Sequence, residues 1–412
     1  MNKLNQTFFS QTSGLVRTIL SDLDNISKPI SKFILTLCLQ WWAISGKYNF
    51  MNMSRYMSYS EQALRNGYRR EFDFCSFNWE LITKNCSDEL ILAFDPSFIH
   101  KSGKHTEGLG YYWSGQEQKT KKGLELGCLA VVDIKNETAF HLHGVLTPDK
   151  QQREKSKMNL IDHYVDLILS SIANAGSISP YLAVDKYFMK KDFINPMINA
   201  GLHVITKMRK DANLKYLYKG KQKEGKGRKR KHAEKVDLKN PDRRRWDIVF
   251  ENKDNYCLSA EVFCVTLKRN VRIIYLFHKK AKSYEVFLST DIDLSADKIE
   301  KYYRSRYQIE FLFRDGKQHS GLEECQARDA KKINFHINLS LTNIGIAKAV
   351  HYLSIPKEQR RGFSLENIKR LHHNKLIADL IFSNLGLYQF HLYFSSKLQR
   401  IFLPRRIKKI VA

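Results

Sequence analysis

The sequence predicts a mixed α/β fold in which helices pack on a sheet and further helical regions lie at both ends. Three observations predict it. Residues 1–89 carry apolar residues at helical spacing and no alternating strand pattern. Residues 90–148 contain three strand-like runs, and residues 159–208 read as helix, strand, helix and strand. Successive strands followed by β-α-β alternation are typical of a mixed sheet with helices packed on it.

The individual elements follow from short patterns. Strands are bounded by turn residues and end in polar groups, whereas helices repeat apolar residues every three to four positions. A loop rich in Gly, Lys and aromatic residues separates the first two strands. We expect strands at 90–95, 124–133, 138–148, 181–185 and 203–208, and helices at 159–175 and 192–202.

The N-terminal region contains a possible helix-turn-helix. Ser58 and Glu61 have capping-box spacing, and the helix that they would open places Arg65 and Arg69 on one face. Residues 52–57 could form the preceding helix. The pattern fits a second helix offered to a DNA groove, and it fits a solvated basic helix equally well.

A basic segment interrupts the α/β pattern at residues 219–245, which hold 13 Lys and Arg against four acids. Like charges at this density resist packing, so we expect the segment to be exposed and mobile until a polyanion binds. Strand-like runs at 246–252, 256–267, 271–279 and 283–290 follow and predict an antiparallel insertion. The chain is helical again from Ser295, and a last helical region covers 364–385. These changes divide the chain into regions 1–89, 90–213, 214–292, 293–356 and 357–412.

Composition narrows the class of partner. The net charge is +27, which favours nucleic acid as the usual partner. The longest apolar run, residues 33–44, is too short to span a bilayer, so we expect no membrane partner, and the first residues show no signal-peptide pattern. The seven cysteines are scattered without a CxxC pair. That spacing argues against a disulfide scaffold or a zinc site and favours a reducing cytoplasm.

Two acids stand at the ends of predicted strands, Asp95 and Asp185. Side chains at the ends of adjacent strands converge, and hard divalent ions such as Mg²⁺ prefer carboxylate oxygens. A third carboxylate is needed for two ions, and Glu310, on the helix after the insertion, is the candidate. Two ions would activate the attacking hydroxyl and stabilise an in-line displacement at phosphorus. No nucleophile elbow, Gly-rich phosphate loop or HExxH motif competes with this interpretation.

The helix around Glu310 carries a polar stripe. Tyr303, Arg306, Glu310 and Lys317 fall within an arc of roughly 60° on one face of the helix. A phenol, a guanidinium, a carboxylate and an ammonium on one face suit a metal ligand flanked by phosphate-binding donors. The alternative is a surface stripe of ion pairs, with Arg306 bound to Glu310.

The spacing Tyr-x2-Arg-x3-Glu-x6-Lys resembles the YREK signature of the DDE transposases of bacterial insertion sequences. FDPSFIHKSGKHTEGLGYYWSG and AVDKYF also resemble the segments that carry the first and second Asp of that family. The resemblance covers residues 90–350. It implies a ribonuclease H-like core that a β-strand insertion interrupts between the second Asp and the Glu.

The resemblance further implies a function. Asp95, Asp185 and Glu310 would bind two Mg²⁺ ions, for which Mn²⁺ could substitute, while Tyr303, Arg306 and Lys317 contact DNA phosphates. The enzyme would cleave DNA at terminal inverted repeats and join the ends to target DNA. It would act as a homodimer in the DNA complex, in the bacterial cytoplasm at the nucleoid.

Family members often stack an aromatic residue of the insertion on a flipped base. Trp246 is the candidate because it follows Arg243, Arg244 and Arg245, which we expect to bind DNA. A tryptophan that opens a strand can equally be a core residue, and Trp113, after Asp95, has a similar claim. Three other functions stay open: a ribonuclease H-like nuclease without strand transfer, a transposase-derived DNA-binding protein without catalysis, and a basic RNA-binding protein.

Overall fold

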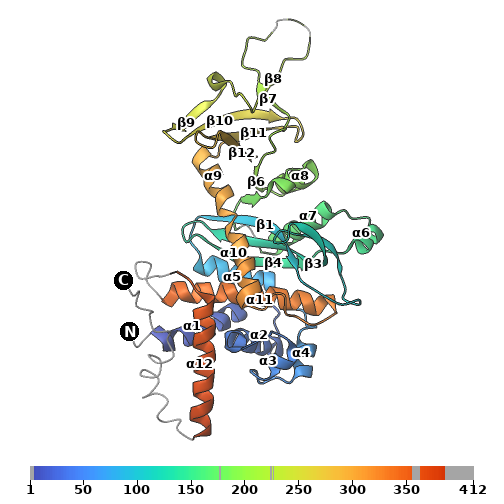
Figure 1. Cartoon of the computed structure of the whole chain (residues 1–412), viewed down its shortest axis with the longest axis vertical. Helices are drawn as coiled ribbons and strands as arrows, with labels where there is room; N and C mark the ends of the chain where they lie inside the picture. The colour runs from blue at the N-terminus through green and yellow to red at the C-terminus, as the bar shows by residue number, and fades with distance from the viewer. Residues whose placement is uncertain (1–3, 176–177, 223–224, 226, 355–361, 386–412) are drawn as a thin grey trace.

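A large mixed sheet forms the centre of the molecule (Figure 1). The computed structural model describes residues 4–175, 178–222, 225, 227–354 and 362–385. The strands of these residues run in the order β2-β3-β1-β5-β6-β12-β11-β10-β7-β8, with β4 on β3 and β9 on β10. The N-terminal helices lie at one end of the molecule, and the strands of the insertion form the part of the sheet at the other end.

The first part of the core contains the parallel strands. Phe94 lies opposite Val184 in the parallel pair β1–β5, and β5 pairs in parallel with β6. Residues 91–94 are fully buried because helices cover both faces of the sheet here. The elements are β1 (Leu90–Ile99), β2 (Gly110–Ser114), β3 (Lys119–Asp133), β4 (Thr138–Leu146), α6 (Lys150–Ser156), α7 (Leu160–Ala175), β5 (Tyr181–Val184), η2 (Lys186–Phe188), α8 (Lys191–Asn199) and β6 (His203–Lys207).

The insertion extends the same sheet. Phe287 of β12 pairs with Lys207 of β6 in an antiparallel ladder, so the insertion and the core share backbone hydrogen bonds. Its elements are β7 (Leu214–Leu217), β8 (His232–Lys235), η3 (Arg243–Arg245), β9 (Asp247–Glu251), β10 (Asn255–Cys264), β11 (Arg269–His278) and β12 (Ser283–Ser289). Most of the described residues of the basic segment are exposed as expected, but Val236 and Leu238 are buried, and β8 and η3 lie within the segment. β8 forms because it pairs with β7, whose alternate residues are buried.

Helices complete both ends. In the described residues these are α1 (Leu4–Asp22), α2 (Lys28–Gln40), η1 (Trp41–Ala43), α3 (Phe50–Ser54), α4 (Glu61–Gly67), α5 (Phe74–Asn85), α9 (Ala296–Ser305), α10 (Gln308–His319), α11 (Ala330–Ser354) and α12 (Leu365–Asn384). α11 lies between the sheet and the N-terminal helices and is buried on most sides. The expected ribonuclease H-like mixed sheet with flanking helices is confirmed.

Three local predictions were wrong. Ser60, not Ser58, caps α4, and its hydroxyl accepts a hydrogen bond from the backbone N–H of Ala63. The predicted loop after Asp95 contains strand β2. The single helix expected around Glu310 is two helices, because tight turns at Arg306 and Tyr307 separate α9 from α10.

The division into five regions stays a prediction, and part of its last region, 357–412, lies outside the described residues. Of the described helices, none combines the length and apolar character that a membrane span requires.

Candidate active site

Strand pairing brings Asp95 and Asp185 together. Each follows directly after one member of the Phe94–Val184 pair, so the two carboxylates stand side by side on neighbouring parallel strands. β1 continues to Ile99 because β3 pairs along its whole length, whereas β5 ends at Val184. Both aspartates are half-buried.

Glu310 reaches the same place from α10. A cleft of about 1130 Å³ is lined by all three carboxylates. In the part of the chain that the structure describes, no three His, Cys, Asp or Glu side chains lie close enough together to form a ready-made metal site. Three carboxylates repel one another, and Glu310 is instead held by Arg306, with Oε1 at 3.5 Å from Nη2.

The electrostatics of the cleft favour a cation. Burial is the main cause that raises the pKa of Asp95 to about 7; Arg306 opposes the rise, and the negative charges of Glu310 and Asp185 add to it. Five carboxylates line the cleft against Arg153, Arg314 and Lys317, and Arg306 lies beside Glu310. A donor set of carboxylate oxygens with unbalanced negative charge fits a hard divalent ion.

The stripe residues converge in spite of the break between α9 and α10. The Tyr303 hydroxyl donates to Asp185 Oδ1 at 3.5 Å, and the Arg306 guanidinium lies 5.8 Å from the Tyr303 ring centroid. Only 12% of the Arg306 side chain is exposed. Its Nε is buried and has no hydrogen-bond partner among the described residues. This N–H is a donor without an acceptor among the described residues, on a side chain that contacts the cleft residue Glu310.

Lys317 also lines the cleft, from the last turn of α10. Its Nζ donates to the backbone oxygen of Phe98 at 2.6 Å and lies 3.5 Å from Glu323 Oε1. Burial lowers the pKa of Lys317, and Glu323 opposes that effect. Lys317 is therefore tied to the end of β1 in this structure.

The comparison with protein families bears directly on this cleft. Residues 87–344 match the model described as the transposase DDE domain, which covers more than half of the chain and contains all three carboxylates. The chain belongs to the transposase DDE domain family. Comparison with curated proteins gave no match.

Within this transposase domain, Trp246 does not reach the cleft. It is 5% exposed, and its Nε1 donates to the Tyr216 hydroxyl at 3.0 Å. The ring also meets the edge of Tyr275 at 6.0 Å. These contacts support the core interpretation of Trp246 over base stacking, because a covered ring offers no face to a base.

The three arginines before Trp246 form the short helix η3 and are paired with acids. Arg243 contacts Glu251 at 2.5 Å, Arg244 contacts Asp242 at 3.0 Å, and Arg245 contacts Glu234. They lie on the insertion and do not line the cleft. Their assignment to DNA stays a prediction.

Glu125 is a cleft residue that the sequence did not indicate. It lies on β3, is 7% exposed and lines the cleft beside the three carboxylates. The Tyr164 hydroxyl donates to Oε1 at 2.5 Å, and burial raises the pKa of Glu125. The signal in the sequence was an acid inside the apolar run LELGCL, where a charge needs a partner.

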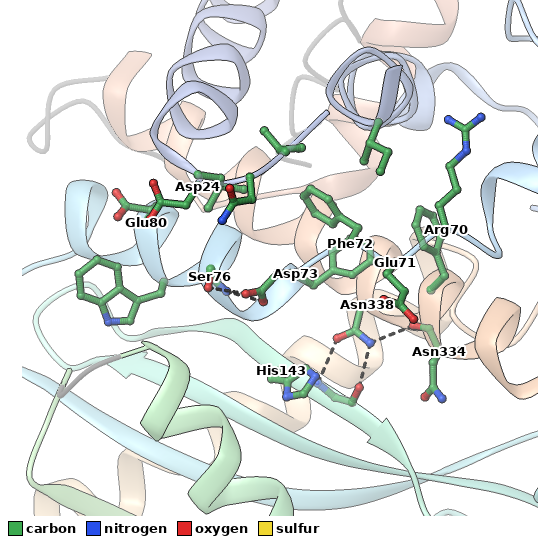
Figure 2. Close-up of a pocket in the computed structure, with 18 of the residues that line it drawn as sticks. Asp24, Arg70, Glu71, Phe72, Asp73, Ser76, Glu80, His143, Asn334 and Asn338 are labelled. Atoms are coloured by element: carbon green, nitrogen blue, oxygen red, sulfur yellow. Dashed lines mark hydrogen bonds between the residues drawn. The ribbon is translucent and has the colours of Figure 1, made fainter. Parts of the chain in front are cut away.

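A second cavity of about 980 Å³ lies between the N-terminal helices, β4 and α11 (Figure 2). Its polar groups maintain the local fold. Asp73 caps α5 by accepting from Ser76 N at 3.0 Å, and Asn338 bonds both backbone groups of Gly144. The cavity contains none of the three carboxylates. The first cleft is therefore the candidate active site.

Proposed function

We propose that this chain is a DNA transposase that cleaves DNA at terminal inverted repeats and joins the freed ends to target DNA. The observation that supports it best is the convergence of Asp95, Asp185 and Glu310 on one cleft inside a transposase DDE domain. From the YREK spacing we further propose that the chain belongs to the subfamily with that signature and comes from a bacterial insertion sequence. The net charge of +27 supports DNA as the partner.

In this proposal Asp95, Asp185 and Glu310 would hold two Mg²⁺ ions, which Mn²⁺ could replace. Divalent ions at such a site lower the pKa of the attacking hydroxyl and balance charge on the phosphate. The side chains of the protein position the DNA. Arg306 would donate its unpartnered Nε–H to a phosphate oxygen, which would also satisfy a buried donor.

The reaction follows from in-line geometry. The oxygen of water, and later of a DNA 3′-hydroxyl, attacks phosphorus while the bond from phosphorus to the leaving oxygen breaks. Tyr303 would orient Asp185 through its hydroxyl, and Lys317 would exchange Glu323 for a phosphate. Arg243, Arg244 and Arg245 would bind DNA at a distance from the cleft. The active form would be a homodimer on paired DNA ends in the cytoplasm, at the nucleoid.

The test uses purified full-length protein and duplexes that carry the inverted repeats flanking its gene. Asp95→Asn, Asp185→Asn and Glu310→Gln should each abolish cleavage in Mg²⁺ while leaving DNA binding measurable. Glu300→Gln is the matched control. Glu300 pairs with Arg304 on the surface of α9 and does not line the cleft, so its loss should leave cleavage normal.

The products separate the alternatives. A transposase joins a 3′-end to new DNA, a nuclease gives cleavage without joining, and a DNA-binding relative gives neither. Wild-type cleavage by any of the three carboxylate variants would overturn the assignment of that residue.

A further inference from the structure

The loop that follows α10 holds Glu323 at the edge of the candidate active site. This loop is fixed by the residues behind it. Gly321 has a left-handed φ of +67°, and a Cβ there would lie 2.4 Å from the Tyr48 ring, so the position requires glycine. His336 Nε2 donates to the Gly321 backbone oxygen at 2.7 Å, and the Tyr48 backbone N–H donates to Glu324 at 2.7 Å. The Glu323 carboxylate is therefore presented by a firmly anchored support.

One oxygen of Glu323, Oε1, is shared between two segments of the chain. His100, directly after β1, places its backbone N–H at 3.2 Å and its ring Nδ1 at 3.0 Å from this oxygen. Lys317 of α10 places its Nζ at 3.5 Å from the same oxygen. The neighbouring Lys101 is directed elsewhere, because its Nζ donates to the backbone oxygen of Cys325. An anion that draws Lys317 away therefore leaves Glu323 with His100.

The other ring nitrogen of His100 faces a second carboxylate. Nε2 lies 3.7 Å from Oε1 of Glu117, in the turn between β2 and β3. Glu117 also contacts Lys119 at 3.3 Å and Lys121. The Phe98 ring meets the His100 ring at a centroid distance of 5.0 Å and supports it from the side. A neutral imidazole has one N–H to donate and a charged one has two, so the charged ring can donate to both carboxylates at once.

We propose that Glu323 and His100 are positioning residues for Lys317. In the protein without DNA, Glu323 holds the Lys317 ammonium at the edge of the cleft. When a DNA phosphate takes Lys317, the His100 ring gains a proton from the solvent and donates to Glu323, so that the carboxylate keeps a charged partner beside the DNA. The inference rests on the proposed function, in which Lys317 contacts phosphate. Histidine rings change charge between about pH 5 and 8, so the exchange makes DNA binding depend on pH in that range.

Proton linkage gives the direction of this pH dependence. The complex binds one more proton at His100 than the protein without DNA, so a lower pH favours the complex. Near pH 8 few histidine rings are charged, and Glu323 then opposes the transfer of Lys317 to a phosphate. The opposition has the strength of one partly exposed ion pair, which is about threefold in affinity. Near pH 6 the charged ring compensates for Glu323, and the opposition disappears.

The test measures the affinity of the full-length protein for a labelled terminal-repeat duplex by fluorescence anisotropy, in EDTA so that catalysis plays no part. Glu323→Gln keeps the size of the side chain and removes its charge. It should bind about threefold more tightly than the wild type near pH 8 and equally near pH 6. His100→Gln should match the wild type near pH 8 and bind about threefold more weakly near pH 6. His105→Gln is the control, because His105 is an exposed histidine of the same loop, and it should match the wild type throughout.

Two further measurements isolate the contribution of this pair. Burial raises the pKa of Asp95 to about 7, so this carboxylate changes charge in the same pH range in every variant, and the comparison is made between variants. In a Lys317→Ala background, Glu323→Gln should no longer change the affinity at either pH, because no ammonium is left to hold. Thermal melts confirm that each variant is folded.

The remaining outcomes overturn the proposal. An equal loss of affinity at both pH values in His100→Gln or Glu323→Gln would indicate that the residue only maintains the fold. Wild-type affinity of both variants at both pH values would mean that Lys317 does not exchange partners. Failure of the proposed function is separate. A wild type that shows the pH-dependent differences but never cleaves in Mg²⁺ keeps the positioning pair and loses the transposase assignment, whereas one that cleaves without these differences keeps the assignment and loses the pair.

Discussion

Replacing Arg306 with lysine keeps the positive charge beside Glu310 but removes the flat guanidinium group with its several donors. In the structure this group contacts Glu310 at 3.5 Å and leaves a buried Nε–H without a partner among the described residues. A lysine ammonium is a point charge and cannot keep the carboxylate contact and present a second, fixed donor to a phosphate.

The expected size of the effect follows from that geometry. A hydrogen bond to a charged group contributes about 1.5–3 kcal/mol. With a tenfold change for about every 1.4 kcal/mol, Arg306→Lys should slow cleavage roughly 10- to 100-fold. A surface ion pair alone contributes at most about 1 kcal/mol, so the simple ion-pair interpretation predicts a slowing of less than about fivefold.

The assay is single-turnover cleavage of a terminal-repeat duplex in saturating Mg²⁺. Arg304→Lys is the matched control, because Arg304 lies two residues away and is half exposed, and it pairs with Glu285 and Glu300 outside the cleft. It should cleave within about twofold of the wild type. A wild-type rate for Arg306→Lys, or an equal defect in Arg304→Lys, would refute the phosphate contact.

Three further predictions concern other parts of the chain. Lys317→Ala should weaken binding of the terminal repeat and slow cleavage about tenfold, and a matching defect in Glu323→Gln would instead indicate that the ion pair is structural. Replacing residues 243–245 with alanine should lower the slope of log affinity against log salt, by about 0.9 for each phosphate that these arginines neutralise, and an unchanged slope would remove them from the interface. Burial lowers the pKa of His141 to about 3 and of His336 to about 4, so the unfolded state binds more protons below the ordinary pKa of 6.5. Stability should therefore fall as pH drops below 6.5, by roughly 2 kcal/mol per histidine at pH 5 in denaturant titrations, and His336→Gln should flatten that dependence.

The sequence predicted the parts of the fold that depend on local patterns. The alternation of strands and helices between residues 90 and 208 is confirmed within a few residues at most boundaries. The sequence could predict that Asp95 and Asp185 lie close together, because both follow short apolar runs typical of strands. Neighbouring parallel strands bring such strand ends to the same edge of the sheet. These inferences depend only on the spacing of apolar residues along the chain and require no knowledge of contacts between distant residues.

Features set by tertiary contacts were not predictable. The segment from Tyr303 to Tyr307 contains no Gly or Pro, yet the helix breaks at Arg306. Ile299 of α9 and Ile309 of α10 are both fully buried. The packing of these two helices, rather than helix propensity, therefore sets the break. Trp246 is covered by tyrosines that are 30 residues before it and 29 after it in the chain.

The ladder between β6 and β12 sets the position of the insertion in discrete steps. Strand register changes only by whole residues, and a slip of one residue would turn every side chain of β12 to the opposite face. A slip of two residues would restore the faces but move the insertion about 7 Å along the sheet. Since β6 also pairs with β5, which ends beside Asp185, any displacement of the insertion would act on that carboxylate through backbone hydrogen bonds. We therefore expect length changes to be tolerated at the distant turns of the insertion and to disrupt the fold at its junction with β6.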